Sequence, residues 1–142
     1  KDVLPMLDAT DRQILAILEQ DGRLQWKEIG ERVHMTGQAV AMRIQKMIDD
    51  GVIEGFTVRT DPAKRGLGIV FYITVYMKTN DHASFHRFLA SRPEIVEAHR
   101  TSGGGCYLLK ANVADHQAMN ELLDAILPFG NYGVSQSIQR LK

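Results

Sequence analysis

The fold is indicated most clearly by residues 36–53, which read Thr-Gly-Gln-Ala-Val-Ala-Met-Arg-Ile-Gln-Lys-Met-Ile-Asp-Asp-Gly-Val-Ile. Thr36 can cap the first turn of a helix through its hydroxyl, and Gly51 supplies the left-handed residue that ends it. Between them, apolar residues recur at the helical spacing i, i+4, i+7 and i+8 and are expected to form the buried face: Val40, Ile44, Met47 and Ile48. The stretch therefore predicts an amphipathic helix with both of its ends marked.

The opposite face of this helix mixes amide and cationic side chains and carries no acid before Asp49. Its residues are Gln38, Ala41, Met42, Arg43, Gln45 and Lys46. Hydrogen-bond donors and cations on one helix face are typical of a helix that contacts DNA. We interpret it as a recognition helix.

Two more helices are expected upstream. Asp8 can cap the first, whose apolar stripe is Ile14, Leu15 and Leu18. The second runs from about Gln25 to Val33, and its spacing predicts that Trp26, Ile29 and Val33 are buried. Three helices with a tight turn before Thr36 predict a helix-turn-helix.

After Gly51 the chain continues with β-branched and aromatic residues as far as Arg59. This pattern predicts a small wing strand, so the N-terminal domain is expected to be winged. Three short amphipathic helices also describe small bundles with no nucleic-acid role, and residues 1–60 hold 3 Lys and 5 Arg against 10 acidic residues. The DNA interpretation therefore depends on where the cations lie and not on their number. These cations include Arg23 and Lys27 near the start of the second helix.

The whole chain is formally neutral and has no apolar run long enough to span a bilayer or to form a signal peptide, so we expect a cytoplasmic protein without a membrane partner. Asp61-Pro62 and Gly66-Leu67-Gly68 interrupt the periodicity. They predict a hinge at residues 61–68, between a DNA-binding domain at 1–60 and a second domain at 69–142.

The second domain alternates strand and helix patterns. Strands are predicted at residues 69–77, 96–101, 107–113 and 134–141. One helix, capped by Asn80 or Asp81, follows the first strand, and another, capped by Asp115, follows the third. Pro128 and Gly130 are expected to end this second helix. The order βαββαβ is the ferredoxin-like arrangement, so the chain is expected to be an α+β protein. One sheet face stays open, and dimerisation through it is expected.

Several short segments, spread across nearly the full chain, form a recognisable pattern. In the first half these are Leu7-Asp8-x-x-Asp11-Arg12-Gln13-Ile14-Leu15, Asp21-Gly22-Arg23, Glu28-Ile29-Gly30, the helix of Arg43, Gly51-Val52-Ile53-Glu54-Gly55-Phe56 and Asp61-Pro62. The second half adds Ser102-Gly103 followed by Tyr107-Leu108-Leu109-Lys110. In order and spacing these segments resemble the leucine-responsive regulator (Lrp/AsnC) family, and those of the second half resemble the glycine loop and strand of its effector-binding domain.

The resemblance implies a prokaryotic transcription regulator of amino-acid metabolism that binds double-stranded DNA. Members form homodimers and usually assemble further into octamers. It implies recognition-helix contacts by Thr36, Gln38, Ala39, Met42, Arg43 and Lys46, with Thr36 holding the helix N-terminus against phosphate. Arg23 and Lys27 are expected to contact phosphates.

Family members bind a small effector, commonly an amino acid, between dimers beside the glycine loop. This implies a site at Ser102, Gly103, Gly104, Gly105 and Cys106. Many members have an Asp where this chain has Cys106, and a carboxylate there would pair with an amino-acid ammonium group. Three alternatives therefore stay open: the effector binds differently, it is something other than a free amino acid, or the protein has no effector. Ser135 and Ser137, which share a strand face, are secondary candidates.

Other functional classes find little support. Cys106 is the only cysteine, which excludes an internal disulfide and a multi-cysteine zinc site. His82 and His86 have metal-ligand spacing without an accompanying acid or cysteine motif, so no metal, cofactor or catalytic residue is expected. A second interpretation within the DNA-binding class is an architectural protein that wraps DNA around an oligomer and needs no effector.

Overall fold

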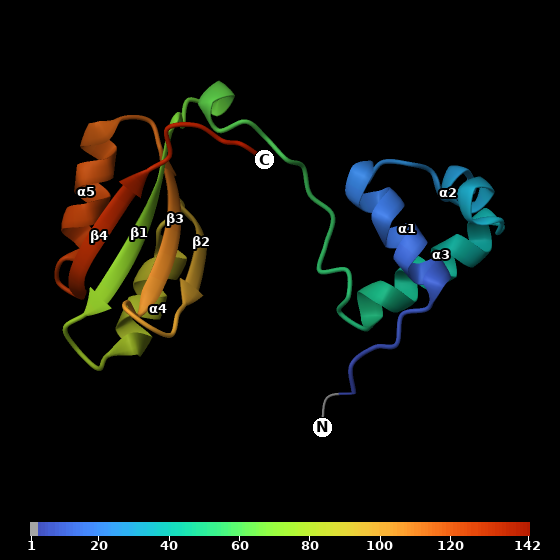
Figure 1. The fold of residues 1–142 in the computed structure, drawn as a ribbon, viewed down its shortest axis with the longest axis horizontal. Coiled ribbons are helices and arrows are strands. Elements are labelled where there is room, and N and C mark those ends of the chain that lie inside the picture. Colours follow the sequence, from blue (N-terminus) through green and yellow to red (C-terminus); the bar gives the residue numbers. More distant parts are fainter. Residues whose placement is uncertain (1–2) are drawn as a thin grey trace. The chain divides into compact units, whose positions relative to one another are not determined.

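A computed structural model describes residues 3–142 of the chain. The chain divides into two compact units, of which the first ends at Val58 and the second begins at Arg59 (Figure 1). In its described part the first unit is helical, with α1 at Ala9–Gln20, α2 at Trp26–Val33 and α3 at Gly37–Asp49. None of the helices within residues 3–142 is long and apolar enough to cross a membrane.

Local side-chain caps explain where these helices begin. The Asp8 carboxylate accepts a hydrogen bond from the backbone N–H of Asp11 at 2.8 Å, and the Asp8 N–H donates to the Asp11 carboxylate at 3.1 Å. Thr36 caps α3 by accepting from the Ala39 N–H at 3.1 Å, as its sequence position predicts. The helices meet in a core formed by Ile14, Ile29, Val33, Val40, Ile44 and Met47.

Two predictions of burial are wrong. The Trp26 side chain is 51% exposed and Ile48 is 37% exposed. Trp26 is the first residue of α2, and helical side chains lean towards the N-terminus, so its indole extends past the end of the helix. Ile48 lies at the margin of the apolar stripe, next to the buried Met47.

The expected wing strand is absent from residues 52–60. Val52 and Ile53 instead pack against the helical core, and both of their N–H groups donate to the Met47 carbonyl, at 2.8 and 3.0 Å. Farther along, Phe56 is 58% exposed and Val58 is 78% exposed. A strand requires a neighbour to receive its hydrogen bonds, and the described part of the first unit contains no other strand. The first domain is therefore a helix-turn-helix without the predicted wing.

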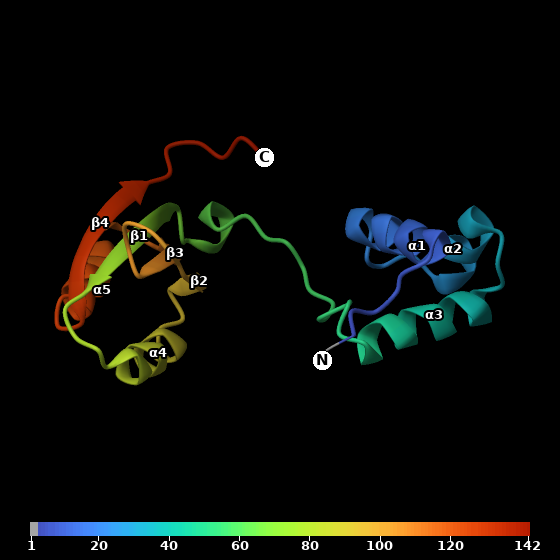
Figure 2. The same ribbon diagram turned by 60° about the horizontal axis from the view of Figure 1, so that its bottom comes forward.

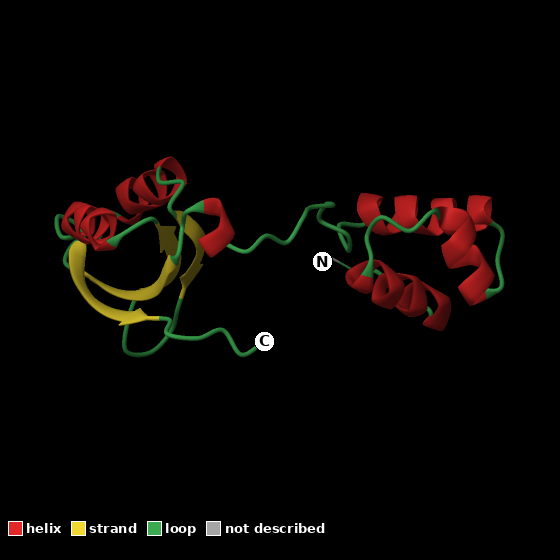
Figure 3. Cartoon of the chain, turned by 90° about the horizontal axis from the view of Figure 1, so that it is seen from above, coloured by secondary structure: helices red, strands yellow, loops and turns green. Residues whose placement is uncertain are grey.

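The second unit has the predicted βαββαβ order. Its elements are β1 at Ile69–Met77, α4 at His82–Ser91, β2 at Ile95–Arg100, β3 at Tyr107–Val113, α5 at His116–Ile126 and β4 at Gly130–Gln136. The strands form an antiparallel sheet in the order β2-β3-β1-β4. Both helices cover the same face of the sheet and leave the other face open (Figures 2 and 3).

Alternation along β1 and β3 separates the two faces of this sheet. Towards the helices the strands contribute buried residues that pack on Phe85, Leu122 and Ile126: Phe71, Ile73, Val75, Tyr107, Leu109, Ala111 and Val113. The open face carries large side chains that are 39–45% exposed: Tyr72, Tyr76 and Leu108. The chain therefore holds an apolar core on one side of the sheet and a partly apolar surface on the other.

The last strand differs from the predicted range of 134–141, because it begins at Gly130 and ends at Gln136. Gly130 lies so close to β1 that an added Cβ would collide with the Tyr76 carbonyl. The glycine is thus required by close approach inside the sheet and does not end the preceding helix. Residues 61–68, predicted as a hinge, fall in the second unit and contain a 3₁₀ helix, η1, at Ala63–Arg65. The location of the hinge stays a prediction.

Candidate nucleic-acid interface and ligand loop

The turn between α2 and α3 is held by two glycines and one left-handed residue. His34 ends α2 with φ 59°. An added Cβ on Gly30 would collide with the Met35 carbonyl oxygen, and one on Gly37 would lie 3.1 Å from the Lys27 nitrogen. Because both glycines let backbones approach closely, the start of α3 packs directly against the start of α2. This geometry is that of a helix-turn-helix.

The side chains on the outer face of α3 differ in their exposure and in whether they bond to other residues. Gln38 is exposed, Met42 is 70% exposed, and neither makes a hydrogen bond or ion pair with another residue of the described chain. Ala39 is half-buried beneath the Thr36 cap. The exposed side chains without a partner in the N-terminal half of α3 are thus the amide of Gln38 and the flexible thioether of Met42.

Arg43, predicted to contact DNA, is held within the first unit. Its Nη1 lies 2.7 Å from Oδ2 of Asp8 and 2.9 Å from Oδ1 of Asp11. The hydrogen bond from Arg43 holds the pKa of Asp8 below its ordinary value, and the Asp11 N–H acts in the same direction. The Arg43 side chain is 32% exposed. Sequence periodicity does not reveal this pairing because the partners lie on different helices.

The other polar side chains of α3 are paired along the helix. Lys46 Nζ lies 2.6 Å from the Asp50 carboxylate, whose hydrogen bond raises the pKa of the lysine. Gln45 donates to the Asp49 carboxylate at 2.9 Å. Such exposed i, i+4 pairs are weak and exchange readily with water, so Lys46 remains available for an external phosphate.

Arg23 and Lys27, predicted as phosphate contacts, are both exposed. The Arg23 backbone N–H bonds to the Asp21 carboxylate at 2.9 Å, which fixes the turn before α2. Lys27 lies beside the start of α3, because its backbone approaches Gly37. The structure therefore brings Lys27 close to the N-terminal end of α3.

The glycine loop between β2 and β3 is anchored at its ends and bare in its middle. Thr101 donates through Oγ1 to the Gly105 carbonyl at 2.8 Å, and the Cys106 N–H donates to Val75 at 2.8 Å. Gly103 adopts φ 102°, and Gly103 and Gly104 have no heavy atom within 4 Å of an added Cβ. Within residues 3–142 the N–H groups of the three loop glycines donate no hydrogen bond. These N–H groups are therefore free to donate hydrogen bonds to a ligand.

Cys106 is half-buried and its N–H is committed to β1, while Ser102 is exposed. Ser135 and Ser137 do not lie with this loop. Ser135 pairs with Tyr72, and the Ser137 N–H donates to Val70 at 2.8 Å, whereas the loop joins β3 opposite Val75. At about 3.3 Å per residue, this offset separates Ser135 from the loop by about 10 Å along β1. The predicted effector residues therefore fall into two groups.

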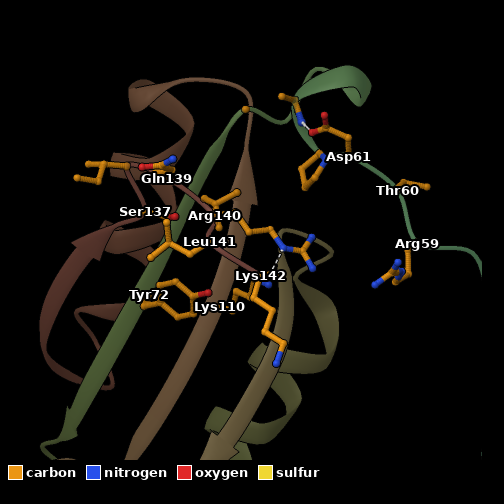
Figure 4. Close-up of a pocket in the computed structure, with 15 residues that line it drawn as sticks. Arg59, Thr60, Asp61, Tyr72, Lys110, Ser137, Gln139, Arg140, Leu141 and Lys142 are labelled. Atoms are coloured by element: carbon orange, nitrogen blue, oxygen red, sulfur yellow. Dashed lines mark hydrogen bonds between the residues drawn. The ribbon is translucent and has the colours of Figure 1, made fainter. Parts of the chain in front are cut away.

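Ser137 borders a hollow on the open face of the sheet, which Figure 4 shows above Tyr72 and Lys110. Sequence patterns gave no signal for this hollow, since its residues come from both ends of the second unit and from β1 and β3: 59–63, 68, 70, 72, 110 and 137–142. Arg140 borders it and donates through Nε to the Lys142 carbonyl at 2.7 Å. Its chemistry is mixed, with several cations beside an aromatic ring.

The two histidines with metal-ligand spacing share a single partner. His82 Nδ1 and His86 Nε2 lie 2.7 and 2.9 Å from the Tyr107 hydroxyl. Across residues 3–142 no group of three His, Cys, Asp or Glu side chains is arranged to hold a metal ion. The histidines thus contribute to the hydrogen bonding that joins α4 to β3.

Comparison with known proteins agrees with this geometry. Residues 7–48 match the AsnC-type helix-turn-helix domain, and residues 70–142 match the Lrp/AsnC ligand binding domain. The HTH-type transcriptional regulator LrpB of Bacillus subtilis is 44% identical over 136 residues, which cover 96% of this chain and 91% of that protein.

Two solved structures superpose closely on the chain. LrpC of B. subtilis has a TM-score of 0.92 at 24% identity and covers 97% of this chain and 99% of its own, which shows the shared fold. A transcriptional regulator from Neisseria meningitidis, solved as a complex with L-Met, has a TM-score of 0.90 at 27% identity, with coverages of 96% and 93%. These relatives are transcription regulators and not enzymes, and the chain belongs to the Lrp/AsnC family of DNA-binding transcriptional regulators.

Proposed function

We propose that the protein controls amino-acid-related genes by placing α3 in the major groove of specific DNA sites, and that an amino acid bound near the glycine loop alters this binding. The observation that carries the DNA part is the free outer face of α3, where Gln38 and Met42 have no partner among the described residues. A glutamine amide can pair with adenine, and an apolar side chain can contact a thymine methyl group.

Phosphate contacts complete this docking. The N-terminus of α3, capped by Thr36, carries a partial positive charge, and Lys27 lies beside it. Arg23 and Lys46 are two further exposed cations of the first unit. Since phosphate contacts are the same for every sequence, these residues supply affinity while Gln38 and Met42 supply discrimination.

The protein is proposed to act as a homodimer that assembles further into an octamer. The open face of the sheet supports this, because Tyr72, Tyr76 and Leu108 are each 39–45% exposed on it. A sheet face of this composition is more stable when a second sheet covers it. A dimer also presents two copies of α3, so an operator is expected to hold two half-sites. A regulator of the chromosome of a prokaryote works in the cytoplasm.

The effector is proposed to bind at the glycine loop. The N–H groups of Gly103, Gly104 and Gly105, which donate to no other group within residues 3–142, can donate hydrogen bonds to a ligand carboxylate. The N. meningitidis relative was solved with L-Met, which makes an amino acid the first ligand to test. Cys106 supplies no fixed negative charge for an ammonium group, so the ammonium must find its partner outside this loop.

A gel-shift series tests the proposal. DNA from upstream of the protein's own gene and unrelated DNA of equal length are compared at one salt concentration, with and without a panel of amino acids. Preference for the upstream DNA that changes with one amino acid is the expected result. Equal binding of both DNAs, or no binding, would contradict it.

A matched pair of variants tests the ligand site. Gly104→Leu is expected to weaken the amino-acid response and to leave DNA binding without ligand unchanged, because an added side chain at Gly104 meets nothing within 4 Å. Gly55→Leu, which is equally open, is the control. An unchanged response in Gly104→Leu would place the ligand elsewhere.

A second candidate function is an architectural protein that wraps DNA and responds to no effector. Cys106 in place of the acid favours it, because the loop then lacks a charged partner for an amino acid. Tight DNA binding that no amino acid changes would support this alternative over the first.

A further inference from the structure

We propose that Arg43 is a positioning residue that fixes α3 against α1, and that it does not read bases. The proposal rests on the proposed function, since it concerns how α3 is presented to DNA. Arg43 lies on the recognition helix and its side chain is 32% exposed, so its sequence position suggests a base contact. Its contacts lead to a different role.

The two carboxylates around Arg43 are used completely. Asp8 Oδ1 accepts from the Asp11 N–H, and Asp11 Oδ2 accepts from the Asp8 N–H, which forms the capping box of α1. Arg43 Nη1 then donates to the two remaining oxygens, Asp8 Oδ2 at 2.7 Å and Asp11 Oδ1 at 2.9 Å. Each of the four oxygens therefore has a donor. The cap of α1 and the attachment of α3 are one hydrogen-bonded unit.

The charges also favour keeping Arg43 in this unit. One guanidinium lies between two carboxylates, and the Asp11 side chain is only 15% exposed. If Arg43 left to contact a base, Asp8 and Asp11 would face each other without the guanidinium that bonds to both of them, next to DNA phosphates. Two adjacent negative charges and the phosphates would then repel one another. Binding that kept the unit intact would avoid this cost.

A fixed Arg43 has a direct consequence for recognition. α3 packs on the core through Val40, Ile44 and Met47, and apolar contacts alone allow a helix to rotate or slide slightly. The Arg43 bonds define one orientation. A change in that orientation would move Gln38 and Met42 together relative to any DNA sequence, so the loss of Arg43 is expected to weaken binding to all sequences alike.

The main competitor is a guanidinium that keeps its Nη1 bonds and reads guanine with its free Nε and Nη2 edge. The two roles differ in their effect on specificity. Loss of a bidentate contact with a base costs discrimination, whereas loss of a positioning contact lowers both affinities together.

The experiment measures dissociation constants by fluorescence anisotropy at fixed salt with the full chain. The probes are a duplex that the protein enriches from a random pool and a duplex of the same composition in shuffled order. The ratio of the two dissociation constants, shuffled over enriched, measures specificity. Arg43→Ala is expected to weaken binding of each duplex by about tenfold and to leave this ratio within about twofold of the wild-type value. Met42→Ala, the matched control, is expected to lower the ratio by about tenfold. A ratio that falls by about tenfold in Arg43→Ala would overturn the proposal.

A second set of variants covers the case in which Arg43→Ala does not fold. Asp8→Asn with Asp11→Asn keeps cap oxygens and removes the charges that hold Arg43. If Arg43 is a positioning residue, the Asp8→Asn, Asp11→Asn variant binds both duplexes more weakly than the wild type. Adding Arg43→Ala to this variant then lowers the affinities little further. Tighter binding of either duplex, or an undiminished effect of Arg43→Ala in this background, would overturn the proposal.

Failure of the proposed function is recognised separately. If the wild-type protein binds both duplexes equally, sequence-specific regulation fails, and the positioning role is then decided by urea unfolding. Coupling between Arg43→Ala and the Asp8 and Asp11 changes in a double-mutant cycle supports it, and additive effects contradict it.

Discussion

The Tyr107 hydroxyl lies 2.7 Å from Nδ1 of His82, and the same oxygen lies 2.9 Å from Nε2 of His86. Tyr107 begins β3 directly after the glycine loop and is only 2% exposed, whereas both histidines belong to α4. One hydroxyl can donate to one imidazole and accept from the other. This pair of bonds ties the end of the loop to a helix.

Replacement of Tyr107 by Phe is therefore expected to lower the free energy of unfolding by about 1 kcal/mol, the typical net value of such bonds. Urea unfolding measures the change. Tyr132→Phe is the matched control, because Tyr132 packs against the same core and its hydroxyl has no partner among the described residues. An equal effect of both changes would mean that the histidine contacts contribute nothing.

Gly30→Ala is expected to destabilise the helix-turn-helix by about 2 kcal/mol or more, because the new Cβ would collide with the Met35 carbonyl in the turn before α3. Helix propensity alone would predict a gain of about 1 kcal/mol, so the sign of the effect is informative. Gly55→Ala, where nothing lies within 4 Å, is the control and should change little. Thermal unfolding followed by circular dichroism would distinguish the two outcomes.

Asp8 predicts a pH dependence. The hydrogen bond from Arg43, and then that from the Asp11 N–H, hold its pKa below the ordinary 3.8 in the folded protein. The stabilisation is therefore fully present above the unfolded pKa and is lost as the pH falls through the lowered folded value. The stability difference between the wild type and Asp8→Asn should stay constant above about pH 5 and shrink below that. A difference that grows on acidification would show that the charged form of Asp8 is not the stabilising one.

Cys106→Asp tests the electrostatics of the effector loop. If an amino acid binds there, a carboxylate at this position should pair with its ammonium group and tighten binding by about tenfold or more. Isothermal titration with the amino acid that is active in the gel shift measures the change. Cys106→Asn has a similar shape without the charge and should gain less. Equal affinities for the three proteins would mean that the ammonium lies away from this residue.

The sequence predicted those features that depend on neighbouring residues. Thr36 caps α3 and Gly51 has φ 74°, as the local signals indicate, and β1 and β3 have the predicted bounds. Strong local patterns leave few alternatives, because caps and alternation act within a few residues.

The features that failed depend on distant parts of the chain. The β-branched residues after Gly51 predict a strand, yet Val52 and Ile53 pack on helices because residues 3–58 contain no strand to pair with. Gly130 reads as a stop, although the proximity of Tyr76 makes a glycine necessary inside β4. The ion pairs of Arg43 with Asp8 and Asp11 also could not be predicted from α3 alone, and the DNA contact of Arg43 stays a prediction. Residue patterns along one segment do not report such partners.

The sheet order β2-β3-β1-β4 also affects how the protein is made. Tyr72 and Ser135 pair across β1 and β4 although 62 residues lie between them in the sequence, so β1 cannot gain this neighbour until the ribosome has made the residues of β4. The helices of the first unit contact partners close in sequence and can fold while the ribosome is still translating the rest. Until β4 emerges, β1 exposes an unpaired apolar edge to other nascent chains, and this interval is when the protein is most prone to aggregate.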